Sequence, residues 1–215
     1  MPSDERNATA STDATSASSS DPVFPDVAAC AFWSALFGNT APVEIEVGAG
    51  DGTFLIAAAT DAPETNFLGI ERSRAKARRL DARLVAIAPP SLRVLRADAS
   101  CVLATIVPAA SVRAYHVYFP DPWPKRRHAR RRLFTPDLVA ALGRTLVPGG
   151  RLFTATDVEP YAQRIRATVL ADGRFEERAC GSDHPGLTTA FARKYIAAGR
   201  TLHPAVFMRR MRRER

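Results

Sequence analysis

Hydrophobic and polar positions follow two alternating periods from about residue 26 onward. Short β-branched and aliphatic runs, typical of buried strands, are separated by longer segments whose apolar residues have helical spacing. The predicted strands are residues 43–47, 66–71, 92–95, 112–119, 152–155, 175–179 and 202–208. The predicted helices are residues 27–37, 74–87, 138–146, 159–170 and 190–198, with one more beginning at Thr53.

Turn and cap residues separate these segments. Gly38-Asn39 ends the first helix, Ser73 caps the helix over 74–87, and Pro89-Pro90 stops it. We expect the segment Pro148-Gly149-Gly150 to stop a later helix. Strands alternating with helices predict an α/β fold, a mostly parallel sheet with helices on both faces. Ligands of such sheets bind outside the carboxyl ends of the strands, so we look for chemistry there.

The two ends of the chain differ from its body in composition. Residues 1–22 consist mainly of Ser, Thr, Ala and Asp, so we predict a disordered tail that cannot bury enough surface to offset its ordering entropy. The first 20 residues lack the apolar stretch of a secretory signal, and no run is long enough to span a membrane. We assign residues 23–208 to one domain and residues 209–215 to a basic tail.

The charge of the chain favours a polyanionic partner. Its formal net charge is +8, and residues 1–20, with Arg6 against Asp4, Glu5 and Asp13, contribute −2, so the remainder carries +10. A body this basic favours nucleic acid before a membrane surface, although an arginine-rich soluble protein would have the same composition.

Cysteine and histidine give no sign of a metal site. Three widely spaced cysteines argue against a disulfide framework and a zinc site, and fit a cytoplasmic protein. His116, His184 and His203 lack the spacing of metal ligands, so we predict structural or solvated roles and no metal.

A glycine-rich loop, Gly48-Ala49-Gly50-Asp51-Gly52, follows the first predicted strand. Its spacing is G-x-G-x-G, whereas a dinucleotide loop favours G-x-G-x-x-G around a pyrophosphate. Glu46 and Asp51 would repel a pyrophosphate and attract a cationic group such as a sulfonium. Glu44 shares a strand face with Glu46 but lies farther from the loop.

Acidic residues also end the next two strands. Glu71 is placed to accept both ribose hydroxyls, and Asp98 to face an adenine. Three ordinary turns with solvated carboxylates would give the same pattern, but acids at the ends of three successive strands favour a nucleoside cofactor.

The fourth strand leads into Tyr118-Phe119-Pro120-Asp121-Pro122-Trp123-Pro124-Lys125. The flanking prolines make Asp121 part of a stiff turn, and Trp123 offers a face on which a base could stack. Six Lys and Arg follow within residues 125–132, a density typical of a phosphate-binding patch. The alternative is an ordinary proline turn before a solvated basic helix.

With these residues the chain resembles the bacterial tRNA (guanine-N7)-methyltransferase family. The matching pieces are Phe37-Gly38-Asn39, Glu46-Val47-Gly48-Ala49-Gly50, Gly69-Ile70-Glu71, Asp98-Ala99, Phe119-Pro120-Asp121-Pro122-Trp123-Pro124-Lys125, Arg131-Arg132-Leu133, Ala155-Thr156-Asp157 and Thr189-Ala190-Phe191. They follow the family's order over about residues 36 to 207, and the segment 119–125 is the specific one.

The resemblance implies a Rossmann-like class I methyltransferase fold with a mostly parallel seven-stranded sheet, S-adenosylmethionine as cofactor and tRNA as substrate. The usual target is N7 of the variable-loop guanine. The implied cofactor residues are Glu46, Gly48, Gly50, Glu71, Asp98 and Asp121, and Asp121 is also the candidate catalytic residue. The implied tRNA-binding residues are Lys125, Asp157, Thr189, Phe191 and Ala192. Whether the protein is a monomer or a homodimer stays open.

One departure from the family pattern leaves alternatives open. The family's last motif reads T-x-F-E, but this chain has Thr189-Ala190-Phe191-Ala192, which lacks the acid. A non-catalytic RNA-binding protein that keeps the fold is therefore one alternative. An enzyme that methylates an exocyclic amine of RNA or DNA is another, disfavoured by Asp121-Pro122-Trp123 where such enzymes have an acid or amide followed by Pro-Pro and an aromatic residue.

Overall fold

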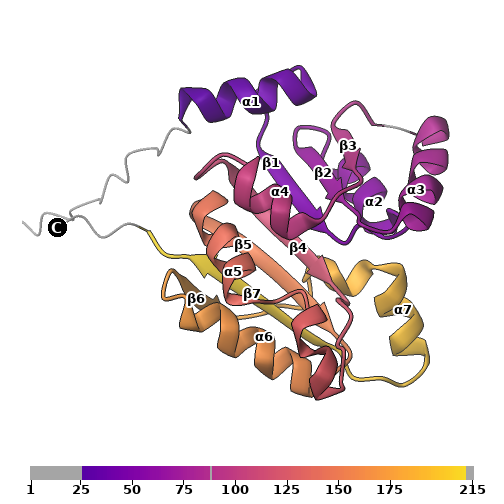
Figure 1. Ribbon diagram of the computed structural model, residues 1–215. Helices are drawn as coiled ribbons and strands as arrows, with labels where there is room; N and C mark the ends of the chain where they lie inside the picture. The colour runs from indigo at the N-terminus through magenta and orange to yellow at the C-terminus, as the bar shows by residue number, and fades with distance from the viewer. Residues whose placement is uncertain (1–25, 88, 212–215) are drawn as a thin grey trace, which may run out of the picture.

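A computed structural model describes residues 26–87 and 89–211, which form a sheet with helices against both faces (Figure 1). The strands are β1 (Val43–Val47), β2 (Asn66–Ile70), β3 (Leu92–Leu95), β4 (Val112–Tyr118), β5 (Leu146–Thr156), β6 (Phe175–Arg178) and β7 (His203–Arg209). The α-helices are α1 (Val27–Phe37), α2 (Thr53–Asp61), α3 (Arg74–Ile87), α4 (Ala99–Thr105), α5 (Pro136–Thr145), α6 (Glu159–Ala171) and α7 (Ala190–Ala197). Two 3-10 helices are η1 (Arg126–Arg131) and η2 (Pro185–Thr188).

Two predicted tail segments are not part of this description. Residues 1–22, predicted to be a disordered tail, lie outside the described residues, as do residues 212–215 of the predicted basic tail.

The seven strands are ordered β3-β2-β1-β4-β5-β7-β6. Strands β1 to β5 pair in parallel, and β7 runs antiparallel to both β5 and β6. The expectation of a mostly parallel seven-stranded sheet is confirmed. Chain order reverses between β1 and β4, whose register pairs Glu46 with His116, so the carboxyl ends of these two strands mark the switch point at which such sheets bind ligands.

The central strands are buried on both faces, which explains their nearly continuous apolar sequences. On one face Ile45, Tyr115 and Leu152 pack in a core that includes residues of α1, α4, α5 and α6. On the other face Phe67 packs with Leu55 of α2 and Leu80 of α3. The two layers hold the strand ends in place, with the loops that follow them at one edge of the sheet (Figure 1).

The pattern predicted most elements but missed three. Helix α4 was not predicted, because its seven residues begin directly after its N-cap Asp98, which we interpreted only as the end of a strand. The 3-10 helices η1 and η2 were also missed, since each is only four to six residues long.

Strand β5 starts six residues before the predicted strand over residues 152–155. Helix α5 ends at Thr145, and β5 continues through the segment 148–150, which we expected only to stop the preceding helix. Its pairing with β4 shifts in register between Val112 and Ala114. A Cβ at Gly150 would lie 2.8 Å from the carbonyl oxygen of Val147, so the irregular strand needs a glycine at this point.

Within the described residues, no helix combines the length and the apolar composition needed to cross a membrane.

Candidate active site

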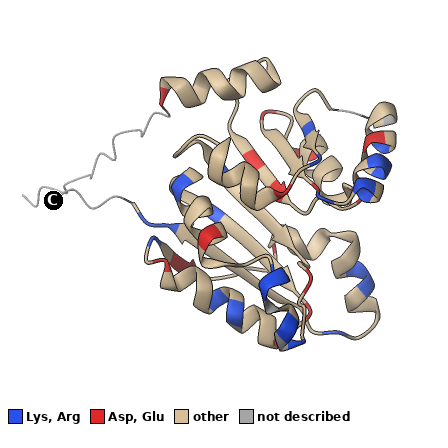
Figure 2. Cartoon of the chain, in the orientation of Figure 1, with Lys and Arg blue, Asp and Glu red and all other residues tan. Residues whose placement is uncertain are grey.

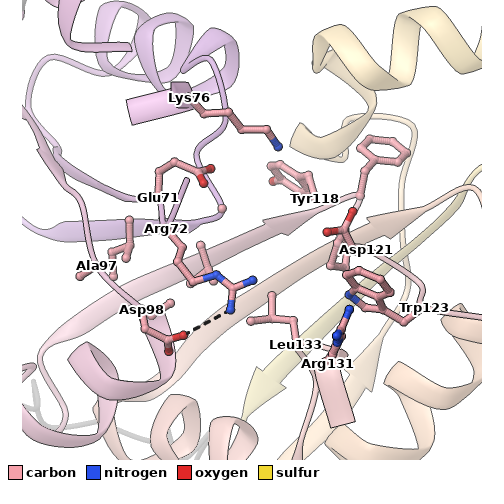
Figure 3. A pocket seen from close by; sticks show the side chains of 16 residues that line it. Glu71, Arg72, Lys76, Ala97, Asp98, Tyr118, Asp121, Trp123, Arg131 and Leu133 are labelled. Atoms are coloured by element: carbon pink, nitrogen blue, oxygen red, sulfur yellow. Dashed lines mark ion pairs between the residues drawn. The ribbon is translucent and has the colours of Figure 1, made fainter. Parts of the chain in front are cut away.

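A pocket opens at the carboxyl ends of β1, β2 and β4, beside the turn that follows β3 (Figure 3). Four of the predicted site residues, Gly48, Glu71, Asp98 and Asp121, line it together. Its other lining residues are Val47, Ile70, Arg72, Lys76, Ala97, Ala99, Tyr118, Phe119, Pro120, Trp123, Arg131 and Leu133.

Glu71 fixes the loop around this pocket. Its side chain is buried, and its two carboxylate oxygens accept hydrogen bonds from the backbone N–H groups of Gly50, at 2.9 Å, and Ser73, at 2.6 Å. The loop needs its glycines, because Gly52 has a φ of 74° and a Cβ there would lie 2.1 Å from Cδ1 of Leu80. Each carboxylate oxygen has a second lone pair, so Glu71 can still accept ribose hydroxyls from the pocket.

Glu46 lies behind the pocket rather than on its lining. The residue is 6% exposed, and its Oε2 has no hydrogen-bond partner among the described residues. Burial, together with the charges of Asp51 and Glu71, raises the pKa of Glu46 well above its ordinary value. A buried carboxyl with an unused oxygen fits a cationic group bound in the pocket, because a nearby positive charge would favour its ionised form.

Asp98 ends the loop after β3 and begins α4. Its Oδ1 accepts the backbone N–H of Ser100 at 2.9 Å and of Cys101 at 3.4 Å, which caps the helix. Its Oδ2 lies 3.8 Å from a guanidinium nitrogen of Arg72 (Figure 3). Asp98 therefore lines the pocket while it also caps α4.

The turn that carries Asp121 is strained. Phe119 and Trp123, on either side of Asp121, have φ values of 49° and 40°, in the left-handed region that disfavours side chains. Arg132 stabilises the turn, because its Nε and Nη2 each donate a 2.9 Å hydrogen bond, to the carbonyl oxygens of Pro122 and Trp123. The guanidinium of Arg131 lies 5.2 Å from the Trp123 ring centroid, within cation–π range.

A chain of hydrogen-bonded side chains, which the sequence analysis did not identify, leads from Tyr118 on the pocket lining into the sheet. Nδ1 of His116 lies 2.7 Å from the hydroxyl of Tyr118, and Nε2 lies 2.8 Å from Oε2 of Glu44. Glu44 also accepts a hydrogen bond from Arg113 at 2.9 Å. Burial and the charges of Glu46 and Glu44 raise the pKa of Tyr118, so its hydroxyl stays protonated.

The predicted tRNA-binding residues lie outside this pocket. Lys125 is exposed just before η1, and the carboxylate of Asp157, after β5, lies 2.5 Å from a guanidinium nitrogen of Arg200. Phe191, on α7, is 46% exposed, and its ring packs 6.1 Å from that of Phe119. Because Phe119 lines the pocket, α7 contacts the pocket rim through aromatic rings.

Ala192 occupies a buried position in the first turn of α7. Thr189 caps the helix, and its hydroxyl accepts the backbone N–H of Ala192 at 3.0 Å. The family spacing T-x-x-E at these positions matches a capping box, in which the acid would bond back to the N-cap N–H. This chain keeps the hydrogen bond to the Thr189 hydroxyl but has no acid to accept the N-cap N–H. Ala192 is 0% exposed.

The sequence analysis also missed three polar side chains on the pocket lining. Arg72 follows Glu71 directly, Lys76 lies one helical turn farther on, and Tyr118 precedes the turn of Asp121. Alternation along β4 would place Tyr118 on the face of His116, which is a usable signal, whereas nothing local marks Arg72 or Lys76.

No group of three or more His, Cys, Asp or Glu side chains that could hold a metal ion occurs within residues 26–87 and 89–211.

Comparisons with known proteins agree with this geometry. A family model described as "Putative methyltransferase" matches residues 40–205. The 16S rRNA methyltransferase KamB superposes with a TM-score of 0.62 at 15% identity, over 83% of this chain and 92% of that one. A 16S rRNA (adenine(1408)-N(1))-methyltransferase from Catenulisporales acidiphilia superposes with a TM-score of 0.58 at 17% identity, over 85% and 92%. The fold and the pocket thus define a Rossmann-like class I methyltransferase.

Sequence relatives narrow the class. A tRNA (guanine-N(7)-)-methyltransferase from Halorhodospira halophila is 35% identical, over 80% of this chain and 77% of the relative. One from Geobacter metallireducens is 32% identical, over 80% and 83%. One from Leifsonia xyli is 46% identical over 64% of this chain, which spans 61% of that relative's length. The chain belongs to the tRNA (guanine-N7)-methyltransferase family.

Proposed function

We propose that this protein transfers a methyl group from S-adenosylmethionine to N7 of a guanine in tRNA, with the variable-loop guanine as the target. A cytoplasmic location is part of the proposal, because tRNA is the substrate. The observation that carries it is the meeting of Asp121 with Glu71 and Asp98 on one pocket, in a chain of this family. The candidate cofactor residues Glu71 and Asp98 and the candidate catalytic residue Asp121 thus line one pocket, which supports their acting on one ligand.

The residues of the pocket fit S-adenosylmethionine. Glu71 would accept hydrogen bonds from the ribose hydroxyls, and Asp98 would accept one from the exocyclic amine of the adenine. Apolar side chains of Ile70, Ala97 and Leu133 line the same pocket and suit a flat purine. Glu46, buried and unpaired at one oxygen, would favour the positive charges of the cofactor from behind the loop.

When bound, S-adenosylmethionine supplies a methyl group on a positively charged sulfur. Guanine N7 has an in-plane lone pair, so no base is needed to remove a proton. The task left to the protein is to align the guanine, and Asp121 is placed to do this or to stabilise the positive charge that develops on the purine. Arg132 contributes by holding the Asp121 turn through two main-chain carbonyls.

The RNA side of the site would lie around η1 and α7. Lys125, Arg130 and Arg131 are exposed cations that would bind phosphates. Asp157 and the segment Thr189 to Ala192 would border the guanine, although Asp157 is paired with Arg200 and Ala192 offers no polar group.

The test is incubation of the protein with labelled S-adenosylmethionine and bulk tRNA that lacks this modification, followed by nuclease digestion and mass spectrometry. We expect 7-methylguanosine in the variable loop. Label on an exocyclic amine would support the alternative enzyme class instead. Absence of any transferred label, with tRNA still bound, would leave a non-catalytic RNA-binding protein.

A further inference from the structure

Helix α3 and Arg72, which lies just before it, carry a second concentration of positive charge. The sequence analysis did not connect this charge with any function. Residues 72–83 contain six Lys and Arg but a single acid, Asp81. Five of the six are exposed; we call these five the α3 basic face. They are Arg72, Arg74, Lys76, Arg78 and Arg79.

Most of this charge is not neutralised by acids among the described residues. Arg72 lies 3.8 Å from Asp98, and Arg83, the sixth cation, is tied to the Asp51 backbone and carboxylate. In the part of the chain that the structure describes, the other members of the face make no ion pair. They are Arg74, Lys76, Arg78 and Arg79.

The placement of these cations works against the stability of the helix. The first turn of α3 has no acid, although the positive end of the helix dipole lies there and favours carboxylates. Arg74 and Arg78 are four residues apart and Lys76 and Arg79 three apart, so both pairs repel each other on the helix surface. A segment that breaks such local rules without compensation is expected where a partner supplies the missing charge.

The α3 basic face lies across the pocket from η1. Lys76 lines the pocket from α3, and Arg131 lines it from the end of η1. In Figure 3 Lys76 lies on the side of Glu71, and Arg131 lies on the side of Asp121 and Trp123. Figure 2 shows Lys and Arg on both α3 and η1, in separate parts of the molecule. A polyanion that crosses the pocket would meet positive charge on both sides.

We propose that the α3 basic face binds the phosphate backbone of the substrate RNA, so that the RNA is held on both sides of the pocket that receives its guanine. This inference rests on the proposed function, because it takes tRNA as the substrate. RNA fits the surface because a chain of phosphates extends far enough to reach α3 while one base enters the pocket beside Asp121.

The test compares two triple variants that lose the same formal charge. One is Arg74→Gln/Arg78→Gln/Arg79→Gln, which leaves the pocket lining intact. The matched control, Arg151→Gln/Arg166→Gln/Arg178→Gln, removes exposed cations from β5, α6 and β6, across the sheet from α3. Glutamine is a good helix former, so α3 should persist in the first variant.

Binding of tRNA is measured as a function of salt by fluorescence anisotropy. Each lost phosphate contact flattens the slope of log affinity against log salt by roughly 0.7 to 0.9, so the α3 variant should flatten it by about two. At low salt its affinity should fall at least roughly tenfold, whereas the control should change the slope by less than about one. Calorimetry should give wild-type affinity for S-adenosylmethionine in both variants, which verifies that the pocket is intact.

Equal slopes in the α3 variant and the control would overturn the inference. The outcome is separable from that of the proposed function. If the wild-type protein methylates tRNA but the α3 variant binds it like the control, only the inference fails. If the wild-type protein transfers no methyl group yet the slopes differ as expected, the RNA surface stands and the proposed function fails.

Discussion

The two walls of the pocket are held in place by different means. On the side of β1 and β2, Glu71 is buried, and its oxygens are bonded to two backbone N–H groups of neighbouring loops. On the side of β4, Asp121 is exposed in a turn flanked by two positive-φ residues. The side chain that stabilises this turn, Arg132, belongs to the same basic segment that would dock RNA.

This difference separates two properties of the site. The wall that carries Glu71, which we call the acidic wall, is fixed by hydrogen bonds from the main chain to this buried side chain. Its shape should therefore not depend on RNA. The wall that carries Asp121, Arg131 and Arg132, which we call the basic wall, is fixed partly by these two arginines. Their charges also suit phosphates, so RNA docking and the position of Asp121 should be linked. Four predictions test or sharpen this contrast.

The largest expected effect is that of Asp121→Asn, which keeps the size of the side chain and removes its charge. If the carboxylate stabilises the developing charge on the purine, the rate of single-turnover methyl transfer should fall by about a hundredfold or more. Affinity for tRNA should be retained, because phosphate contacts dominate it. A near-wild-type rate would leave Asp121 as a turn residue only.

Glu71→Gln tests the acidic wall. The amide can accept through only one of its two polar atoms, so one of the N–H groups of Gly50 and Ser73 loses its acceptor. The proposed hydrogen bonds from the ribose hydroxyls also lose their charged acceptor. Because a hydrogen bond to a charged group contributes about 1.5–3 kcal/mol, affinity for S-adenosylmethionine should fall roughly tenfold to a hundredfold. Calorimetry measures this affinity directly.

Affinity for tRNA should not change in this variant, because Glu71 itself makes no phosphate contact in our proposal. Asp51→Asn, on the exposed side of the same loop, is the matched control and should have a smaller effect. Equal losses in the two variants would contradict a specific role for Glu71.

The same contrast explains how much the sequence could predict. The acidic wall follows from local signals, since Glu46, Glu71 and Asp98 lie near the carboxyl ends of β1, β2 and β3, which a parallel sheet brings together. The sheet itself followed from periodicity, and β1 and β3 have the predicted bounds. Elements shorter than about two turns, such as η1, carry too few residues for a period to be recognised.

What holds the basic wall has no local signature. Arg132 bonds to carbonyls nine and ten residues earlier in the chain, and the sequence marks it only as one of several arginines. The pairing of Asp157 with Arg200 joins residues 43 positions apart. Such contacts depend on how the chain is folded, so composition and spacing could indicate the charge of this region but not its geometry.

Arg132→Lys separates positioning from docking on the basic wall. Lysine keeps the positive charge but lacks the planar fork that donates to both carbonyls of the turn. Turnover should therefore fall about tenfold, as expected when a single reactant group is misplaced slightly, while the salt dependence of tRNA binding stays at its wild-type value.

Arg130→Lys is the control for this substitution, because no hydrogen bond from Arg130 to the turn occurs among the described residues. It should leave turnover unchanged. If Arg132→Lys changed only the salt slope, Arg132 would be a phosphate contact and not a positioning residue.

The smallest expected effect concerns proton release at Glu46. Burial and the neighbouring carboxylates of Asp51 and Glu71 raise the pKa of Glu46 in the free protein, and a cation in the pocket would lower it again. Binding should then release a proton, and affinity for S-adenosylmethionine should rise with pH between the bound and free pKa values, by at most about tenfold per pH unit. Calorimetry at several pH values, in buffers of different ionisation enthalpy, measures both quantities.

Glu46→Gln should remove this part of the pH dependence, and the wild-type protein serves as the matched control because the titration of the ligand itself is common to both. Stability gives an independent check with the opposite sign. Between the ordinary pKa of Glu and its raised value, the folded protein holds more protons at Glu46 than the unfolded chain, so its stability should decrease as pH rises, and this decrease should be smaller in the variant. Identical pH profiles of both affinity and melting temperature in the two proteins would show that Glu46 does not couple to the cofactor, and the acidic wall would then act through Glu71 and Asp98 alone.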